Sequence, residues 1–279
     1  MRPDRAYDTM FPAMNDAGFK VKQYRFRSGK LHLPLRALHL TDLHCRLYGE
    51  ENRELLDQCR ALKPDLILCT GDMVTGKRRI NAEEVIPFLG ALCELAPIYY
   101  ANGNHETFLR RSPDIYRRYV LGLRSSGIFL INNKTEDFFH GEDRIRISGL
   151  ELPPRLYAKM RIPSMSDEEL YDLIGPPCGG EEEYRILLAH NPQFAEQYVD
   201  WGADLTLCGH FHGGVMRLWK NQVAMSPYGF PLPKYGYGAY HKDGRAVVVS
   251  GGLGDHAVSL RFRNPPELVV LNLLPDKNE

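Results

Sequence analysis

The sequence lacks paired cysteines, long apolar runs and an excess of charge of either sign. Its six cysteines are scattered without a Cys-x-x-Cys pair, so we expect reduced, mostly buried thiols rather than a disulfide framework. The longest near-continuous apolar runs, such as 267–274, have the length of a strand and fall short of the ~20 residues of a membrane-spanning helix. The start, residues 1–5, lacks the apolar core of a secretory signal. These absences predict a cytoplasmic protein.

The charges balance, with 35 Lys and Arg against 35 Asp and Glu. A balanced total gives no support for dedicated nucleic-acid binding, which would need a basic excess or a basic stripe. The composition, 43% hydrophobic and 25% charged, is typical of a soluble globular chain with a full core. We predict a single domain over residues 1–279.

Short apolar runs alternate with helical segments along most of the chain. The predicted strands cover 36–41, 65–70, 98–101, 128–131, 135–139, 144–148, 185–189, 204–208, 246–250 and 268–273. The predicted helices cover 50–62, 82–95 and 115–125. Strands that alternate with helices of this length indicate βαβ units, and so many strands favour an α/β fold of two packed mixed β-sheets flanked by helices.

Three segments depart from this alternation. Residues 19–33 are expected to add an N-terminal strand or hairpin, because apolar and basic residues nearly alternate there. Residues 149–180, rich in Pro and Met, are expected to form an inserted loop or small lobe with a short helix near 166–173. Residues 227–240, dense in Gly, Pro and Tyr, are expected to be irregular.

Five of the ten histidines follow predicted strands directly, next to Asp, Asn or Gly. The strand-end residues concerned are Asp42, His44, Asp72, Asn104, His105, His190, His210 and His212. The carboxyl ends of parallel strands share one edge of an α/β sheet, so we expect these side chains to converge. In an extended segment residues i and i+2 point the same way, which lets both members of each Asp-x-His or His-x-His pair reach one cluster.

Carboxylate, amide and imidazole groups together suit a first-row divalent metal ion. Seven ligands are too many for one tetrahedral ion and suit two ions bridged by a carboxylate. Taken singly, each motif is weak, since a strand-end Asp more often caps the following helix. The ordered set as a whole has no ready structural explanation.

This set, Asp-x-His, Gly-Asp, Gly-Asn-His-Glu, His and Gly-His-x-His, resembles the calcineurin-like metallophosphoesterase family over about residues 35–254. The tail, including 251–254 and 261–267, resembles a bacterial branch that contains phosphodiesterases, some of them membrane- or wall-associated. The resemblance implies a four-layer αββα sandwich. It also implies a dinuclear metal-dependent phosphodiesterase whose nucleophile is a hydroxide that bridges the two metal ions.

Carried over position by position, the resemblance implies a role for each motif residue. One ion would be held by Asp42, His44 and His212, and the other by Asn104, His190 and His210. Asp72 would bridge the ions, and His105 would face the scissile phosphate as the catalytic histidine. Mn²⁺, Fe and Zn²⁺ all accept such ligands.

The second motif departs from the pattern of many family members. They have Gly-Asp-x-x-Asp, whose later Asp helps to orient the catalytic histidine, whereas this chain has Thr75 at that position. A threonine cannot supply a carboxylate, so the partner that orients His105 is not defined by the motif.

Several residues around the motifs have both a functional and a structural interpretation. The cations Lys77, Arg78, Arg79, Arg110 and Arg111 follow two metal loops and could grip a substrate anion, although a solvated surface is favoured. Residues 153–165 form an amphipathic segment that could meet a membrane or an acyl chain, but an ordinary packed loop is favoured. For Lys20, Lys22, Arg25 and Arg27, one face of an exposed strand is favoured. A substrate entrance and simple packing are equally favoured for Tyr228, Tyr235, Tyr237 and Tyr240.

The rival functions are a pyrophosphohydrolase of a nucleotide-sugar lipid, a non-catalytic scaffold and a nuclease. The scaffold is disfavoured because all seven ligands and His105 are present, and the nuclease because the charge is neutral. The expected partner is a small-molecule phosphoester. The chain is expected to be a monomer or small homo-oligomer in the cytoplasm, with peripheral membrane contact as a further option.

Overall fold

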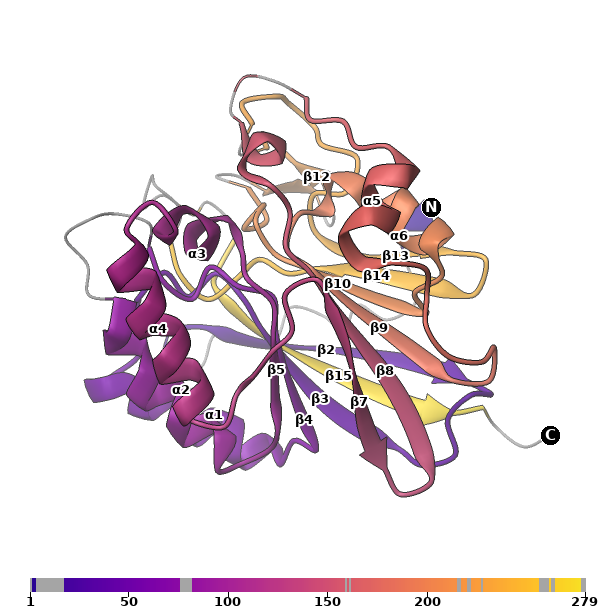
Figure 1. Ribbon diagram of the computed structural model, residues 1–279, viewed down its shortest axis with the longest axis horizontal. Helices are drawn as coiled ribbons and strands as arrows, with labels where there is room; N and C mark the ends of the chain where they lie inside the picture. The colour runs from indigo at the N-terminus through magenta and orange to yellow at the C-terminus, as the bar shows by residue number, and fades with distance from the viewer. Residues whose placement is uncertain are drawn as a thin grey trace.

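Two β-sheets pack face to face in the computed structural model of the chain, with helices on both outer sides (Figure 1). The structure describes residues 2–3, 18–75, 82–158, 160, 162–214, 217–219, 222–226, 228–255, 261 and 264–276. No helix within these ranges is both long and apolar enough to cross a membrane.

The first sheet has six strands in the order β2-β15-β3-β4-β5-β6. Their bounds are Lys20–Ser28 for β2, Glu267–Pro275 for β15, Leu35–Leu40 for β3, Leu66–Cys69 for β4, Ile98–Tyr100 for β5 and Phe129–Leu130 for β6. Strands β3 to β6 run parallel, while β15 runs parallel to β2 and antiparallel to β3. The last strand of the chain therefore lies between its two earliest long strands.

The second sheet has seven strands in the order β1-β13-β14-β10-β9-β8-β7. Their bounds are Arg2–Pro3, Gly238–Lys242, Arg245–Val249, Leu205–Cys208, Tyr184–Ala189, Asp143–Leu150 and Lys134–His140, in that spatial order. The four central strands are parallel, and the strands at both edges are antiparallel. A separate two-stranded sheet pairs β11 (Arg217–Trp219) with β12 (Gln222–Val223).

Helices cover the outer face of each sheet (Figure 1). The six-stranded sheet is covered by α1 (Arg53–Leu62), α2 (Ile86–Cys93) and α4 (Pro113–Ser125). The seven-stranded sheet is covered by α5 (Asp167–Ile174) and α6 (Ala195–Trp201). The short helix α3 (Asn104–Leu109) begins directly after β5, and single turns of 3₁₀-helix lie at η1 (Glu50–Asn52), η2 (Ala82–Val85), η3 (Pro154–Tyr157) and η4 (Pro192–Phe194).

The central strands are apolar on both faces because both faces are covered. Along β3, Leu38 and Leu40 pack toward the helices, whereas Leu35 and Ala37 face the other sheet. A third apolar cluster lies between the seven-stranded sheet and α5 and α6. The predicted architecture of two mixed sheets flanked by helices is confirmed.

The three segments that depart from the predicted alternation of strands and helices differ in how closely they match their predictions. Residues 19–33 supply β2 and a turn, and β2 pairs with β15. Residues 149–180 connect the parallel neighbours β8 and β9 and contain η3 and α5. The prediction that 227–240 is irregular throughout is wrong at its end, because β13 begins at Gly238.

The interpretation of the basic residues on β2 as one exposed face is wrong. Lys20 and Lys22 are buried, while Arg25 and Arg27 are exposed. Successive side chains of a strand alternate between the two faces of the sheet, so Lys20 and Lys22 cannot lie on the same face as Arg25 and Arg27. The buried pair lies on the face of β2 that points toward the other sheet, and Lys20 Nζ lies 3.1 Å from Oε2 of Glu267 on the neighbouring strand β15.

Candidate metal centre

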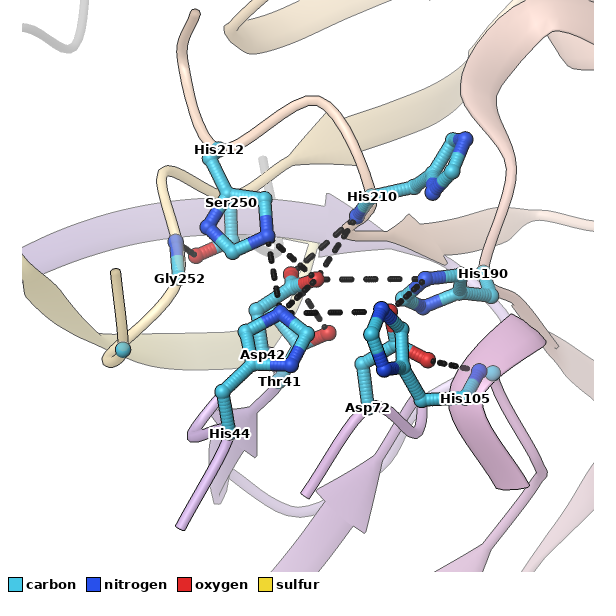
Figure 2. A network of polar contacts seen from close by, with 12 residues as sticks. Thr41, Asp42, His44, Asp72, His105, His190, His210, His212, Ser250 and Gly252 are labelled. Atoms are coloured by element: carbon cyan, nitrogen blue, oxygen red, sulfur yellow. Dashed lines mark hydrogen bonds and ion pairs between the residues drawn. The ribbon is translucent and has the colours of Figure 1, made fainter. Parts of the chain in front are cut away.

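Seven of the eight strand-end residues predicted to converge lie in one cluster between the ends of the two sheets (Figure 2), and the eighth, Asn104, begins the helix that carries His105. The six-stranded sheet contributes Asp42 and His44 after β3, Asp72 after β4, and the start of α3 after β5. The seven-stranded sheet contributes His190 after β9, and His210 and His212 after β10. The cluster therefore joins two halves of the chain that are far apart in sequence.

The backbone of these loops is strained at the residues that point into the cluster. Asp42, His44, Asp72, His210 and His212 all have φ between 50 and 64°. This left-handed region is uncommon for residues with a side chain, although Asp, Asn and His enter it more readily than others. Such strain is typical of positions that the surrounding structure holds for a functional reason.

Two glycines allow the loops after β4 and β5 to touch. A Cβ atom on Gly71 would collide with the backbone of Gly103, and one on Gly103 would collide with Asp72. Backbone hydrogen bonds then join the loops after β3 and β4, since the amides of Asp42 and His44 donate to the carbonyls of Gly71 and Asp72 at 3.0 Å. The close approach explains why glycine precedes both motif residues.

The first group of candidate ligands consists of Asp42, His44 and His212. His44 Nε2 lies 3.0 Å from His212 Nε2, and His212 Nε2 lies 3.2 Å from Asp42 Oδ1. The other ring nitrogen of His44 faces the carbonyl of Val74 at 3.3 Å, which fixes the tautomer that leaves Nε2 with its lone pair. Separations near 3 Å suit atoms that share one ion at bond lengths of about 2.0–2.2 Å.

The second group consists of Asp72, His190 and His210. His190 Nε2 lies 3.1 Å from Asp72 Oδ2, and its Nδ1 faces the Thr70 carbonyl at 2.7 Å. Among the described residues, the Nε2 of His210 and the Oδ1 of Asn104 are buried without a hydrogen bond. Buried acceptors left in this way are expected where a cation binds.

Asp72 is common to the second group and to a third, which contains His44 and His105. Its Oδ2 lies 3.9 Å from the Nε2 of each of these histidines. The Oδ1 atom accepts a hydrogen bond from the amide of His105 at 2.7 Å. The Asp72 carboxylate therefore lies between the two sides of the cluster.

Both carboxylates of the cluster have pKa values held below the ordinary range. Burial acts to raise the pKa of Asp42, but His212 and His190 outweigh burial and lower it. Burial acts in the same direction on the pKa of Asp72, and His190 again leads the charges that lower it. Both groups are ionised at neutral pH, as ligation requires.

The pKa values of the histidines in the cluster shift in opposite directions. Burial lowers the pKa of His44 to about 3 and that of His210 well below its ordinary value. At His190 burial also acts to lower the pKa, but the carboxylates of Asp72 and Asp42 prevail and raise it to about 9. A cation that binds Nε2 of His190 therefore competes with a proton.

His105 is the most accessible histidine of the cluster, with 31% of its side chain exposed. Its ring packs edge-on against His44, with the ring centroids 4.7 Å apart. Thr75 does not take over the role of the missing carboxylate, because its hydroxyl is buried without a hydrogen bond to any described residue. The carboxylate nearest to the His105 ring in the described structure is that of Asp72.

Glu106 is a residue of the site for which the motif analysis gave no role. Its buried carboxylate accepts hydrogen bonds from the amides of Asp72, Met73 and Gly103 at 2.7, 2.8 and 3.0 Å. The hydroxyl of Tyr100 donates to it as well, at 2.8 Å. Glu106 is the last residue of the Gly-Asn-His-Glu motif. Its role could not be predicted, because no residue pattern marks a buried carboxylate that binds backbone amides.

The cations near the site are not all available for a substrate. Arg110 donates to Glu151 Oε2 at 2.5 Å, and Arg111 lies over the ring of Phe108. Lys77, Arg78 and Arg79 lie outside the described residues. Arg261, which begins the tail segment 261–267 and had no role assigned from sequence, places Nη2 3.2 Å from Nδ1 of His212.

The four tyrosines after the Gly-His-x-His loop are all buried, and they separate into two groups. The ring of Tyr228 lies 5.7 Å from that of His210, at the site. Tyr235 and Tyr237 instead donate hydrogen bonds to Glu196 and Glu267, and Tyr240 packs against Tyr235. Packing therefore accounts for these three.

Comparisons with known proteins identify the family of the chain. The sequence profile of the family described as calcineurin-like phosphoesterase matches residues 35–214. The phosphodiesterase YaeI of Escherichia coli (strain K12) is 28% identical over 247 residues, which cover 86% of this chain and 83% of that protein. The uncharacterized metallophosphoesterase YkoQ of Bacillus subtilis (strain 168) is 27% identical over 239 residues, covering 84% and 82%.

Among solved structures, the 5'-nucleotidase precursor from Thermus thermophilus has a TM-score of 0.48 at 17% identity. The match covers 86% of this chain and 54% of that one. From the sequence profile, the chain belongs to the calcineurin-like phosphoesterase family. It is a metal-dependent phosphoesterase with a candidate metal-binding cluster.

Proposed function

We propose that the protein is a phosphodiesterase that uses two divalent metal ions. Asp42, His44 and His212 hold one ion, and Asn104, His190 and His210 hold the other. Asp72 bridges them. The position of the Asp72 carboxylate between two groups of candidate ligands is the observation that carries this assignment.

The donor atoms support two ions rather than one. The first group offers two imidazole nitrogens and a carboxylate, and the two imidazole nitrogens lie 3.0 Å apart. The second offers buried imidazole and amide atoms that make no hydrogen bond to the described part of the chain. This mixture of N and O donors suits Mn²⁺, Fe or Zn²⁺.

The chemistry divides between the ions and the side chains. When bound, divalent cations of this kind supply a water of lowered pKa as the nucleophile and offset the charge of the phosphate. His105 is partly exposed beside Asp72 and donates a proton to the leaving oxygen, or a hydrogen bond to a non-bridging oxygen as charge builds there. Glu106 holds the loops that carry Asp72 and His105 in register.

The diester preference draws on the relative whose name is phosphodiesterase. Its test is a panel of an aryl phosphomonoester, an aryl phosphodiester and a pyrophosphate, assayed with Mn²⁺-reconstituted protein and again after chelation. We expect the diester to be hydrolysed fastest and the chelator to abolish turnover. Faster hydrolysis of the monoester or the pyrophosphate would refute the diester assignment, and turnover that survives complete metal removal would refute the metal mechanism.

A second candidate, cleavage of the pyrophosphate bond in a nucleotide-sugar lipid, is favoured by an apolar surface near the site. Met160 and Ile162 are 76% and 67% exposed. The amide of Met160 donates to the carbonyl of Tyr228, whose ring contacts His210. The neighbours Lys159 and Arg161 lie outside the described residues. Activity on such a lipid that depends on detergent would support this candidate, and equal activity on a soluble pyrophosphate would count against it.

A further inference from the structure

Tyr157 lies against the second group of candidate ligands. It ends η3 in the connection between β8 and β9, and η3 packs against α3, the helix that carries Asn104. Its ring meets His210 edge-on, with centroids 5.0 Å apart and planes at 75°, and lies 6.2 Å from the ring of His190. The side chain is therefore in direct contact with two residues of the site.

The hydroxyl of Tyr157 is buried and makes no hydrogen bond to any residue that the structure describes. The neighbouring buried tyrosines differ from it. The hydroxyl of Tyr228 donates to the Leu156 carbonyl at 2.8 Å, and that of Tyr198 donates to the Asn191 carbonyl at 2.9 Å. A buried hydroxyl without a partner is unfavourable, and in native proteins it calls for an explanation.

Other unpaired atoms of the site supply the explanation. Within the described ranges, the buried atoms without a hydrogen bond include Asn104 Oδ1 and His210 Nε2 together with the Tyr157 hydroxyl. The first two are acceptors and suit a cation, whereas a phenol O–H is a donor and suits an anion. A phosphoryl group that a cation binds at this place offers such an oxygen.

We propose that the Tyr157 hydroxyl donates a hydrogen bond to a non-bridging phosphoryl oxygen of the substrate, on the side of the site formed by Asn104, His190 and His210. The proposal rests on the proposed function, because it requires a phosphoryl group at that place. Tyr157 is then a substrate-binding residue that lies outside all of the sequence motifs.

The variant Tyr157→Phe removes the hydroxyl and keeps the ring that packs on His210. We expect its metal content to equal that of the wild type. We expect kcat/KM, and the affinity of the metal-loaded protein for orthophosphate measured by calorimetry, to fall about 10- to 100-fold, the usual effect of a lost hydrogen bond to a charged group. Unchanged values in a wild type that is active would overturn the proposal.

A second readout uses the metal-free protein and needs no activity. Removal of a buried hydroxyl that has no partner leaves the unfolding temperature unchanged or raises it. The matched control is Tyr240→Phe, since Tyr240 is also buried but its hydroxyl accepts a hydrogen bond from the amide of Tyr237. The control is expected to lower the unfolding temperature and to keep kcat/KM. A lower unfolding temperature for Tyr157→Phe would show a structural partner and overturn the proposal.

The two readouts separate failure of this proposal from failure of the proposed function. A wild type that binds metal but hydrolyses no member of the panel would refute the phosphodiesterase. The orthophosphate affinities of wild type and Tyr157→Phe would still decide the role of the hydroxyl. Equal affinities would refute that role whatever the wild type hydrolyses.

Discussion

The histidines of the site differ in what their second ring nitrogen contacts. In His190 and His44 that nitrogen faces a backbone carbonyl, which holds the ring and directs Nε2 into the cluster. His105 instead contacts the cluster through its exposed ring, against His44 and near Asp72. The first arrangement suits a ligand and the second a residue that meets substrate, so the two kinds of histidine should respond differently to mutation.

Replacing His105 by alanine tests that difference. We expect turnover of the preferred substrate to fall by roughly 10²–10⁴-fold, the usual contribution of a general acid, while metal content stays unchanged. Elemental analysis beside kcat gives both quantities from one preparation. Loss of metal from this variant would mean that His105 is a ligand.

Asp72 should behave in the opposite way. Asp72→Asn keeps the shape of the side chain but removes the charge shared between the two groups, so we expect metal and activity to be lost together. Asp143→Asn is a suitable control, because Asp143 is also buried but contacts His32 and Leu33 instead of the cluster. An Asp72→Asn protein that retained two equivalents of metal would rule out the bridge.

The candidate ligand residues could be predicted from the sequence because their chemistry leaves a pattern. Asp, Asn and His after strands are unusual enough in combination to be recognised. Glu106 and Tyr157 act through burial and through contacts made from other elements, and neither property can be read from a residue type. Thr75 is the reverse case, since the motif drew attention to a position that makes no described hydrogen bond through its hydroxyl.

At the scale of elements, the loops after β4 and β5 form one unit held by Glu106. Its carboxylate accepts from amides on both loops, and Tyr100 and Tyr119 extend the network behind it, with their hydroxyls 2.9 Å apart. The unit carries Asp72 on one side and Asn104 with His105 on the other. The register between the proposed bridge Asp72 and the proposed catalytic residue His105 therefore depends on a residue that binds the backbone amides of both loops.

The variant Glu106→Gln should weaken this unit. The glutamine side chain replaces one carboxylate oxygen by an NH₂ group, which cannot accept the hydrogen bonds that backbone N–H groups now donate to Glu106. We expect a loss of about 2–3 kcal/mol of stability. Urea unfolding of the metal-free protein measures this loss without the effect of bound metal. Glu168→Gln on the exposed face of α5 is the matched control and should change little. A Glu106→Gln midpoint equal to that of the control would contradict the role.

We expect the stability contributed by Asp143, the first residue of β8, to depend on pH. Burial acts to raise its pKa, but the amides of Leu33 and His32 and the His32 ring prevail and lower it. Because the native pKa lies below the ordinary value of about 3.9, the stabilisation is fully present above that pH. It is lost as the pH falls through the native pKa.

We therefore expect Asp143→Asn to destabilise the metal-free protein at pH 7 and the difference from wild type to shrink below about pH 4. Denaturant midpoints at a series of pH values measure it. Asp172→Asn, which changes an exposed side chain on α5, provides the baseline. A difference that stays constant down to about pH 3 would exclude the charge of Asp143 as its cause.

Element prediction succeeded where the hydrophobic pattern is strong and failed where tertiary contacts decide. The buried strands β3, β4, β9 and β10 were expected within one residue at each end. Helices α3 and α6, of six and seven residues, are too short to show a clear period. Strand β13 was missed because its Gly- and Tyr-rich approach has the composition of a loop.

At the scale of the whole molecule, the candidate ligands come from both sheets. Asp42, Asp72 and Asn104 follow strands of the six-stranded sheet, and His190, His210 and His212 follow strands of the seven-stranded sheet. The two-sheet architecture was predictable from the number of strands. The order of strands within each sheet was not, because β15 pairs with β2 and β3 across more than two hundred residues.

Ligands from two sheets couple metal binding to the stability of the whole fold. Cations that bind only the native state stabilise it by about 2.7 kcal/mol at a free concentration one hundred times the dissociation constant. For a chain of this size that corresponds to a rise of roughly 5–10 °C in the unfolding temperature, which scanning calorimetry with and without chelator measures. Asp72→Asn should abolish most of the difference, whereas His105→Ala should retain it. Equal unfolding temperatures with and without excess metal would contradict a site that joins the two sheets, since ions bound at such a site cannot leave the native state unaffected.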